Sequence, residues 1–378
     1  MYLLTAISFV VGVVELIIGG ILDLVARDLG VSVGRAGLLI TGFALVFGIS
    51  GPVLLFLTGK FDRKRVTLAA LFVFAIGKFV AILSNTYGVL LLSRVISAAS
   101  GALLTVLCLT LAARIAAPEY RGRAIGLVVM GISGAVVLGV PIGVSMGHAY
   151  GWRSPFILVV VLTIALMVSV AAFFGKVPTD PPVSLTKQLQ ALRGRRVLAA
   201  HLTTFSLLAG HFILYGYLTP FAILVMGFGG AAITAVYFVY GAAAVTGGGL
   251  AGISADKFGP RRTLLTAIVL LGACLLIIPH TSVAPMLFWA VLVVWGVLSW
   301  SITPPIQSHL VQLAPETAGI QQSLNNAALH LGIALGTLVG SVVIDRFSVE
   351  KNALVGTGFV IIALGAALVS LPRQRTAV

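Results

Sequence analysis

"GKVPTDPPVSLTKQLQALRGRRV", residues 175–197, divides the chain, because it is the longest polar and proline-containing stretch in an otherwise apolar sequence. The 378 residues are 59% hydrophobic and 9% charged, whereas a soluble domain carries about 25% charged residues. The mean hydropathy is +1.14. This composition predicts an integral membrane protein with two halves joined by the polar stretch.

The apolar windows on both sides of this stretch have the length of membrane-spanning helices, which need about 20 apolar residues. Six precede it, at 3–26, 35–57, 66–84, 87–113, 123–147 and 156–175, and six follow, at 197–221, 232–254, 263–280, 285–313, 318–344 and 353–371. The first window has no basic stretch before it and no cleavage pattern, so we interpret it as a retained span. We predict an all-α protein with a six-helix bundle over 1–176, a cytoplasmic linker over 177–196 and a second six-helix bundle over 197–378.

The basic residues follow the loops in alternation. Lysine and arginine outnumber acidic residues 24 to 10, and they gather after spans 2, 4, 6, 8 and 12, at Lys60, Arg63, Lys64, Arg65, Arg114, Arg121, Arg123, Lys176, Lys187, Arg193, Arg195, Arg196, Lys257, Arg261, Arg262, Arg373 and Arg375. Because cytoplasmic loops carry the excess of basic residues, both termini are predicted to be cytoplasmic. The chain has too few polar residues to build a water-facing patch for nucleic acid.

The two halves share a repeat. "GKFDRKRVTL" (59–68) and "DKFGPRRTLL" (256–265) both follow the second span of a half. They match without a gap at Lys60/Lys257, Phe61/Phe258, Lys64/Arg261, Arg65/Arg262 and Leu68/Leu265. Parallel six-helix repeats around a central site are a transporter architecture.

Several segments resemble one family. "GISADKFGPRR" (252–262) resembles the cytoplasmic loop signature of the major facilitator superfamily, and "GISGAVVLGVPIGVSMGHAYGWRSPF" (131–156) resembles the span 5 motif of its twelve-span drug:proton antiporter branch. Arg94 and Gly101 in "SRVISAASG" are similar to that branch's span 4 motif. "VELIIGGIL" (14–22), "LAGHFILYGYLTPF" (208–221) and "IQQSLNNAALHLGIALG" (320–336) resemble bacterial purine base and nucleoside efflux pumps. The resemblance implies the major facilitator fold, twelve transmembrane helices in two pseudo-symmetric six-helix bundles.

Glu15 lies near the middle of span 1. A charged carboxylate at the bilayer centre costs at least about 2.5 kcal/mol, so we expect it to face the bundle interior, where loss of water favours the protonated form. We predict that Glu15 couples transport to protons; the alternative is a hydrogen-bonded packing acid. The resemblance implies a proton relay for Arg94 in span 4, with the alternative of a packing cation bonded to backbone carbonyls. His211 in span 7 is the third candidate for coupling.

Span 11 carries an amide stripe, because Gln322, Asn326 and His330 repeat at i, i+4 and i+8 with Asn325 adjacent. Such a stripe cannot face lipid without leaving amides unsatisfied. A purine needs flat aromatic faces and paired donors and acceptors. The candidate substrate site is therefore Tyr215, Tyr217, Trp295, Trp300, Gln322, Asn325, Asn326 and His330. The alternative for each residue is a hydrogen bond between helices or a place in the interfacial aromatic belt.

The candidates for conformational gating are charged loop residues and small residues of span 5. The resemblance implies charge contacts between helix ends for Asp256, Arg261 and Arg262. In the first half the signature's acidic position is Gly59, while Asp62, followed by Arg63, stands where the second copy has Gly259. Such basic clusters can also serve only to fix topology. Gly139, Gly143 and Gly147 have the spacing of close helix packing, as do Gly332, Gly336 and Gly340, and Pro141 is expected to let span 5 bend.

The sequence contains no Walker loop, zinc motif or nucleophile elbow, and Cys108 and Cys274 lie in apolar runs. We therefore expect neither an enzyme nor a metal or cofactor, and a proton gradient as the energy source. The prediction is a monomeric proton-coupled exporter in the bacterial cytoplasmic membrane that works by alternating access, with purine bases or nucleosides as substrate. A multidrug or chloramphenicol-type antiporter and a sugar efflux transporter are the alternatives.

Overall fold

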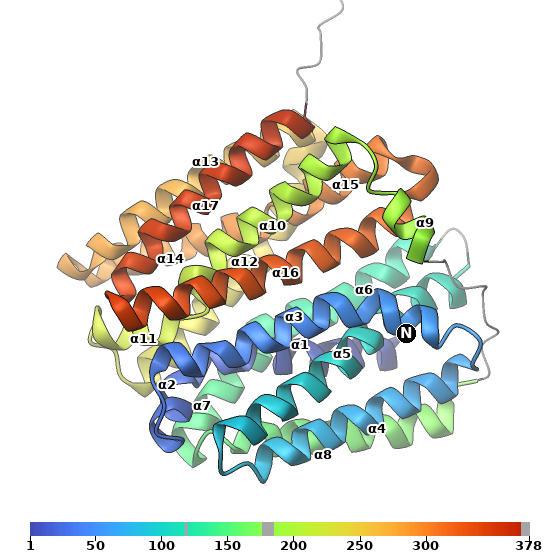
Figure 1. The fold of residues 1–378 in the computed structure, drawn as a ribbon, viewed down its shortest axis with the longest axis horizontal. Coiled ribbons are helices and arrows are strands. Elements are labelled where there is room, and N and C mark those ends of the chain that lie inside the picture. Colours follow the sequence, from blue (N-terminus) through green and yellow to red (C-terminus); the bar gives the residue numbers. More distant parts are fainter. Residues whose placement is uncertain (118–119, 176–184, 372–378) are drawn as a thin grey trace, which may run out of the picture.

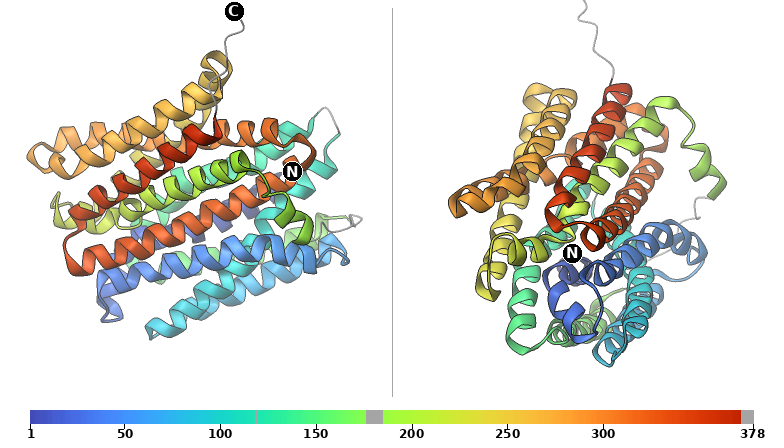
Figure 2. Two further views of the ribbon diagram at one scale, coloured as in Figure 1. Left: turned by 45° about the horizontal axis from the view of Figure 1, so that its top comes forward. Right: turned by 60° about the vertical axis from the view of Figure 1, so that its left-hand side comes forward.

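The computed structural model describes residues 1–117, 120–175 and 185–371. This part of the chain is built of helices, and twelve of them are long and apolar enough to cross a membrane. The helices run side by side in two groups (Figures 1 and 2). The all-α fold class predicted from the sequence is confirmed.

The first half of the molecule contains spans 1 to 6. Its elements are α1 (Tyr2–Gly20), α2 (Leu22–Asp28), α3 (Val33–Leu57), α4 (Arg63–Ile82), α5 (Tyr87–Ile115), α6 (Arg121–Gly134), the π-helical turn η2 (Ala135–Gly139), α7 (Val140–Tyr150) and α8 (Ser154–Phe173).

The second half contains spans 7 to 12. Its elements are α10 (Arg195–Tyr215), α11 (Leu218–Leu224), α12 (Gly230–Phe258), α13 (Pro260–Ile277), the 3-10 turn η3 (Ile278–Val283), α14 (Pro285–Trp300), α15 (Thr303–Leu313), the 3-10 turn η4 (Pro315–Thr317), α16 (Ala318–Arg346) and α17 (Val349–Ser370). The linker prediction falls partly on residues 176–184, and the tail's Arg373 and Arg375 on 372–378, which lie outside the described residues. The described end of the linker forms the short helix α9 (Leu185–Gln190).

The first span ends earlier than the sequence predicted. The window 3–26 indicated one helix, whereas α1 stops at Gly20 and Ile21 leaves helical geometry before α2 begins. Two consecutive glycines weaken a helix at this point. They also allow close approach, because a side chain on Gly20 would collide with Val144 of α7.

The glycine rows of spans 5 and 11 fit against two equivalent helices. Side chains at Gly139, Gly143 and Gly147 would meet Val13, Ile17 and Ile21 of span 1. In the same way, side chains at Gly332, Gly336 and Gly340 would meet backbone oxygens of Phe205, Ala209 and Ile213 in span 7. Both rows step by four residues, one helical turn, on each partner. The two halves thus repeat one packing rule, in which small residues bring helix axes close.

Pro141 is the second residue of α7, which follows the π-helical turn η2. Proline has no N–H for the helix ladder, and a single π turn is a common way to absorb such an irregularity. The proline therefore stands within a continuous span, Arg121–Tyr150, and not at a break.

The halves meet along two pairs of helices, α3 with α16 and α12 with α7 and η2 (Figure 1). Hydrogen bonds between the halves join α1 and α3, with the cap of α3, to α16. Asp345 accepts from Ser32 Oγ at 2.9 Å and from Gly34 N at 3.2 Å, Thr41 bonds Thr337 at 2.8 Å, and Glu15 contacts His330 at 3.1 Å. These hydrogen bonds therefore join the halves from the end of the molecule where α2 lies, which we call the joined end, to the middle of the spans.

Candidate functional site

Glu15 and His330 meet between the two halves. Oε1 of Glu15, from α1, lies 3.1 Å from Nε2 of His330, from α16. The His330 ring also stacks on Phe47 of α3, with centroids 4.2 Å apart and planes at 21°. The Glu15 side chain remains 21% exposed while that of His330 is 5% exposed. One end of the pair is therefore accessible to small molecules and the other is fixed by packing.

The hydrogen bonds of His330 restrict its protonation. Nδ1 lies 2.8 Å from the backbone oxygen of Asn326, and a carbonyl oxygen only accepts, so Nδ1 carries a hydrogen. The contact between Nε2 and Glu15 then requires one further proton, placed either on the imidazole or on the carboxyl. Without it, a carboxylate would face an imidazole lone pair. A hydrogen bond between Nε2 and the Glu15 carboxyl therefore needs this proton.

Arg94 lies behind this pair, fully buried in α5. Its Nη1 donates to Val14 O at 2.6 Å, and Nη2 and Nε point to Glu15 O and Leu39 O at 3.4 and 3.5 Å. Its guanidinium also lies over the Phe43 ring, 4.1 Å from the centroid. The bonds are to backbone oxygens and not to the Glu15 carboxylate, so Arg94 ties α1 to α3 and α5 and positions the segment that carries Glu15.

His211 belongs to a directed chain of hydrogen bonds in the second half. Trp295 Nε1 donates to Nδ1 of His211 at 3.1 Å, and indole is a donor only, so Nδ1 carries no hydrogen. The neutral ring then has its proton on Nε2, which lies 3.1 Å from the Tyr240 hydroxyl. That hydroxyl bonds Ser299 at 2.7 Å, and Ser299 donates to Gly296 O at 2.8 Å. Each group in this series of hydrogen bonds already has its partner.

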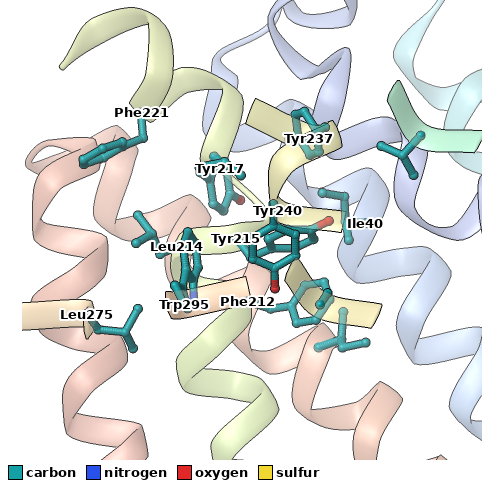
Figure 3. Close-up of a cluster of buried hydrophobic side chains, with 14 of the residues drawn as sticks. Ile40, Phe212, Leu214, Tyr215, Tyr217, Phe221, Tyr237, Tyr240, Leu275 and Trp295 are labelled. Atoms are coloured by element: carbon teal, nitrogen blue, oxygen red, sulfur yellow. The ribbon is translucent and has the colours of Figure 1, made fainter. Parts of the chain in front are cut away.

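Aromatic rings contact His211 on several sides, and Figure 3 shows Tyr215, Tyr240 and Trp295 packed together. Tyr215 stacks on it at 5.1 Å, Tyr240 tilts against Tyr215 at 4.8 Å, and Trp295 meets His211 edge-on at 5.4 Å. All four side chains are buried. Tyr237 of α12 completes the group, with its ring 6.3 Å from Tyr215. Its hydroxyl bonds Thr219 at 3.1 Å and lies near Gly19 of α1. We call His211, Tyr215, Tyr237, Tyr240 and Trp295 the aromatic cluster.

The cluster and the acid lie on neighbouring parts of α1. A side chain on Gly19 would come within 4.0 Å of the Tyr215 backbone oxygen and 3.6 Å of the Tyr237 hydroxyl. Glu15 precedes Gly19 by one helical turn. The aromatic cluster of the second half and the Glu15–His330 pair between the halves are thus adjacent.

Tyr217 and Trp300 lie outside the aromatic cluster. Tyr217, at the break between α10 and α11, donates from its hydroxyl to Thr337 O at 2.8 Å and fills the space beside Gly37 of α3. Trp300, at the end of α14, is half-buried against the hydrophobic core. Tyr217 therefore contributes to the joined end of the halves.

The amides of span 11 divide between two environments. Asn325 accepts from Thr204 at 2.7 Å, which binds α16 to α10. Gln322 is exposed and Asn326 is half-buried. The neighbour of Gln322, Gln321, is fully buried; its Oε1 bonds His201 Nε2 at 2.8 Å and its Nε2 donates to Ala191 O at 2.7 Å. The sequence analysis missed Gln321 and His201, although Gln321/Asn325 at i, i+4 opposite His201/Thr204 on span 7 is a signal that could have found them.

The charged gating candidates lie at the ends of helices. Asp62 caps α4 by accepting from Arg65 N at 3.1 Å, and Arg63, the first residue of α4, is buried. Arg261 Nε donates to Leu371 O at 2.9 Å and so ties α13 to the end of α17. Asp256 is exposed, and within the described residues it has no ion pair in this conformation. No group of described His, Cys, Asp and Glu side chains could hold a metal ion.

The family model described as Major Facilitator Superfamily matches residues 4–337 of this chain. The chain belongs to the major facilitator superfamily. This transporter is 34% identical over 376 residues to YbcL of Bacillus subtilis (strain 168), called an uncharacterized MFS-type transporter, covering 99% of this chain and 96% of the relative. It is also 26% identical over 350 residues to a probable sugar efflux transporter of Mannheimia succiniciproducens, covering 92% of this chain and 88% of the relative.

A solved structure with the same fold is a bacterial homologue of the human lysosomal transporter Spinster, in an inward-facing and occupied conformation. The TM-score is 0.82 at 16% identity, and the match covers 98% of this chain and 95% of that one. At this identity the likeness concerns the fold alone. Twelve apolar helices and membership in this superfamily make the protein a multi-pass bacterial membrane transporter.

Proposed function

We propose that this protein is a proton-coupled exporter of small molecules that works by alternating access. The observation that carries the proposal is the contact between Glu15 and His330 across the two halves. A carboxyl inside a span is expensive to retain and marks a functional position. Here it lies where a change in its protonation acts directly on how the halves are joined.

The coupling follows from the proton count of the pair. With one shared proton, Glu15 and His330 attract; after its release, the carboxylate and the imidazole lone pair repel. Loss of the proton therefore weakens the link between α1 and α16, and proton binding restores it. A substrate that bonds Glu15 competes with His330 for the same carboxyl, which makes proton and substrate binding mutually exclusive. The energy then comes from the proton gradient and no cofactor is required.

The direction of access follows from the charge pattern. If both termini lie in the cytoplasm, as the basic loops indicate, the hydrogen-bonded α2 end of the molecule faces outward. Glu15 and His330 form the innermost hydrogen bond between the halves among the described residues. This arrangement corresponds to an inward-facing state of a single chain in the bacterial cytoplasmic membrane.

The substrate class we favour is a purine base or nucleoside. The aromatic cluster packs flat rings, buried in this conformation, close to the part of α1 that carries Glu15, and planar heterocycles stack on such rings once these are uncovered. Donors and acceptors for the ring-edge groups come from the Glu15 carboxyl, the Asn326 side-chain amide and the Tyr215 hydroxyl. Sugars are the second candidate, because several relatives carry the name probable sugar efflux transporter and sugars also pack their apolar faces on aromatic rings.

The test is transport by the purified protein in liposomes with an imposed pH gradient. Labelled adenine, hypoxanthine and inosine are compared with arabinose, lactose and chloramphenicol. We expect purine movement against its gradient that collapses with a protonophore, and loss of the uphill component in Glu15→Gln. Glu350→Gln, an exposed acid in the first turn of α17, is the matched control. Movement of the sugars alone would replace the substrate class, and proton-driven transport by Glu15→Gln at the wild-type rate would refute the coupling site.

A further inference from the structure

A groove of about 510 Å³ opens in the second half, at the ends of α12 and α14 and the start of α13. These three helices lie beside one another (Figure 1). The groove begins at Leu250, nine residues beyond Gly241, where α12 packs on Val136 of the first half. It is therefore separate from the Glu15–His330 pair and from the contact between the halves.

One end of the groove is polar. Arg262 lines it, is exposed, and has no hydrogen bond or ion pair within the described residues. Its neighbour Arg261 is held by Leu371 O. The hydroxyls of Ser254 and Thr266 also line the groove, and within the described part of the chain neither makes a hydrogen bond. A cation and two hydroxyls are thus available to a ligand at the same place.

The other end is apolar. Leu250 and Leu270 line it and are 53% and 46% exposed, with Val297 and Leu298 behind them. Leu270 follows Arg262 by eight residues on α13, a rise of about 12 Å. A ligand placed along the groove meets first a cation, then hydroxyls, then aliphatic side chains. This is the order of phosphate, ester region and acyl chain in a phospholipid.

We propose that this groove is a binding site for one anionic phospholipid, with its phosphate at Arg262 and one acyl chain between Leu250 and Leu270. The polar end of the groove lies at the loop between α12 and α13, where the headgroups of a bilayer would be. Lys257, Arg261 and Arg262 outweigh Asp256 there, and basic residues at a membrane surface attract anionic lipids. A zwitterionic lipid fits the apolar end equally well, but its headgroup also carries a positive charge, which the basic residues at the polar end repel.

The experiment is native mass spectrometry of the intact purified chain, exchanged into equal amounts of phosphatidylglycerol and phosphatidylcholine with the same acyl chains. We expect one retained phosphatidylglycerol in preference to phosphatidylcholine. Arg262→Gln should lower its retention about fivefold, the contribution of a single basic residue near such a surface. Arg65→Gln removes the same charge at the equivalent position of the first repeat and should leave retention unchanged.

Two further measurements keep the proposal open to refutation. Thr266→Phe fills the groove without a change in charge, and it should abolish retention of the lipid while thermal unfolding confirms that the variant is folded. Soluble glycerol 3-phosphate should not compete with the lipid. Equal retention of the two lipids, an equal loss in Arg65→Gln, or full displacement by glycerol 3-phosphate would each overturn a specific phospholipid site.

Discussion

Oε1 of Glu15 and Nε2 of His330 lie 3.1 Å apart and join α1 of the first half to α16 of the second. Since Nδ1 of the same imidazole already donates to Asn326 O, this contact depends on a single proton. Under the proposed function, a change in the protonation of this carboxyl alters the attraction between the two six-helix bundles.

His330→Gln separates hydrogen bonding from proton carriage. An amide can bond Glu15 in either protonation state, so we expect the distance between the halves to lose its pH dependence. Spin labels at Lys60 and Glu316, in a chain with Cys108→Ala and Cys274→Ala, report this distance by pulsed electron resonance. We expect this distance to depend on pH in the wild type; an equal dependence in the variant would show that another group controls the halves.

Asp345→Asn should loosen the joined end of the halves. The Asp345 carboxylate accepts from Ser32 and from the first turn of α3, and a charge at a helix N-terminus contributes about 1 kcal/mol. We expect a roughly fivefold shift in the populations of the two conformations, away from the one described here. The same pair of spin labels measures it. Glu350→Gln serves as the control, and unchanged populations would remove Asp345 from the gate.

Gly48→Ala tests the close approach of α3 to α16. A Cβ at Gly48 would lie 3.2 Å from both Ala327 O and His330 Cβ, so the neighbours must move by a few tenths of an ångström. Overpacking of this kind costs about 1 kcal/mol or more. We expect a lower melting temperature and slower proton-driven transport. Gly126→Ala, whose Cβ would meet nothing within 4 Å, should leave both unchanged, and equal effects would deny the interface a role.

Trp295→Phe removes the donor to Nδ1 of His211. A buried acceptor without a partner costs about 1–3 kcal/mol, so we expect a clear loss of thermal stability. Trp289→Phe changes a partly buried tryptophan that packs on Phe228 and Phe288 and should have a smaller effect. A Trp295→Phe protein as stable as the Trp289→Phe protein would contradict the directed hydrogen-bond chain.

Asp28→Asn should lower stability in a pH-dependent way. Hydrogen bonds from Trp152 and Arg153 lower the pKa of Asp28 below its ordinary value of 3.8. A carboxyl with a depressed folded-state pKa stabilises the protein above its unfolded pKa, and this contribution disappears as the pH falls through the folded pKa. The side chain is 47% exposed, so the effect is modest. Melting temperatures of wild type and variant should differ at pH 7 and approach each other only below pH 3.8, as the pH falls through the folded-state pKa; a constant difference would exclude the charge as the cause.

The sequence by itself determined the class and the layout of this protein. Twelve apolar windows, the polar stretch at 175–197 and the repeat of "GKFDRKRVTL" in "DKFGPRRTLL" follow from composition and order along the chain. Because each backbone N–H and C=O must be hydrogen-bonded within the protein when it lies in lipid, apolar segments of this length form helices. The glycine rows could also be identified from the sequence, because their four-residue spacing is a property of a single helix.

Only the tertiary structure decided which helix each polar side chain meets. Glu15 and His330 are 315 residues apart, and no local pattern pairs them. Helical spacing suggested Gln322 for the stripe of span 11, and packing against α10 buries the neighbouring Gln321, which bonds His201. Arg94 could bond a carboxylate or backbone oxygens, and the close passage of α1 and α3 supplied the oxygens. The direction of a side chain depends on how helices from both halves cross, and that geometry is set by packing across the whole molecule.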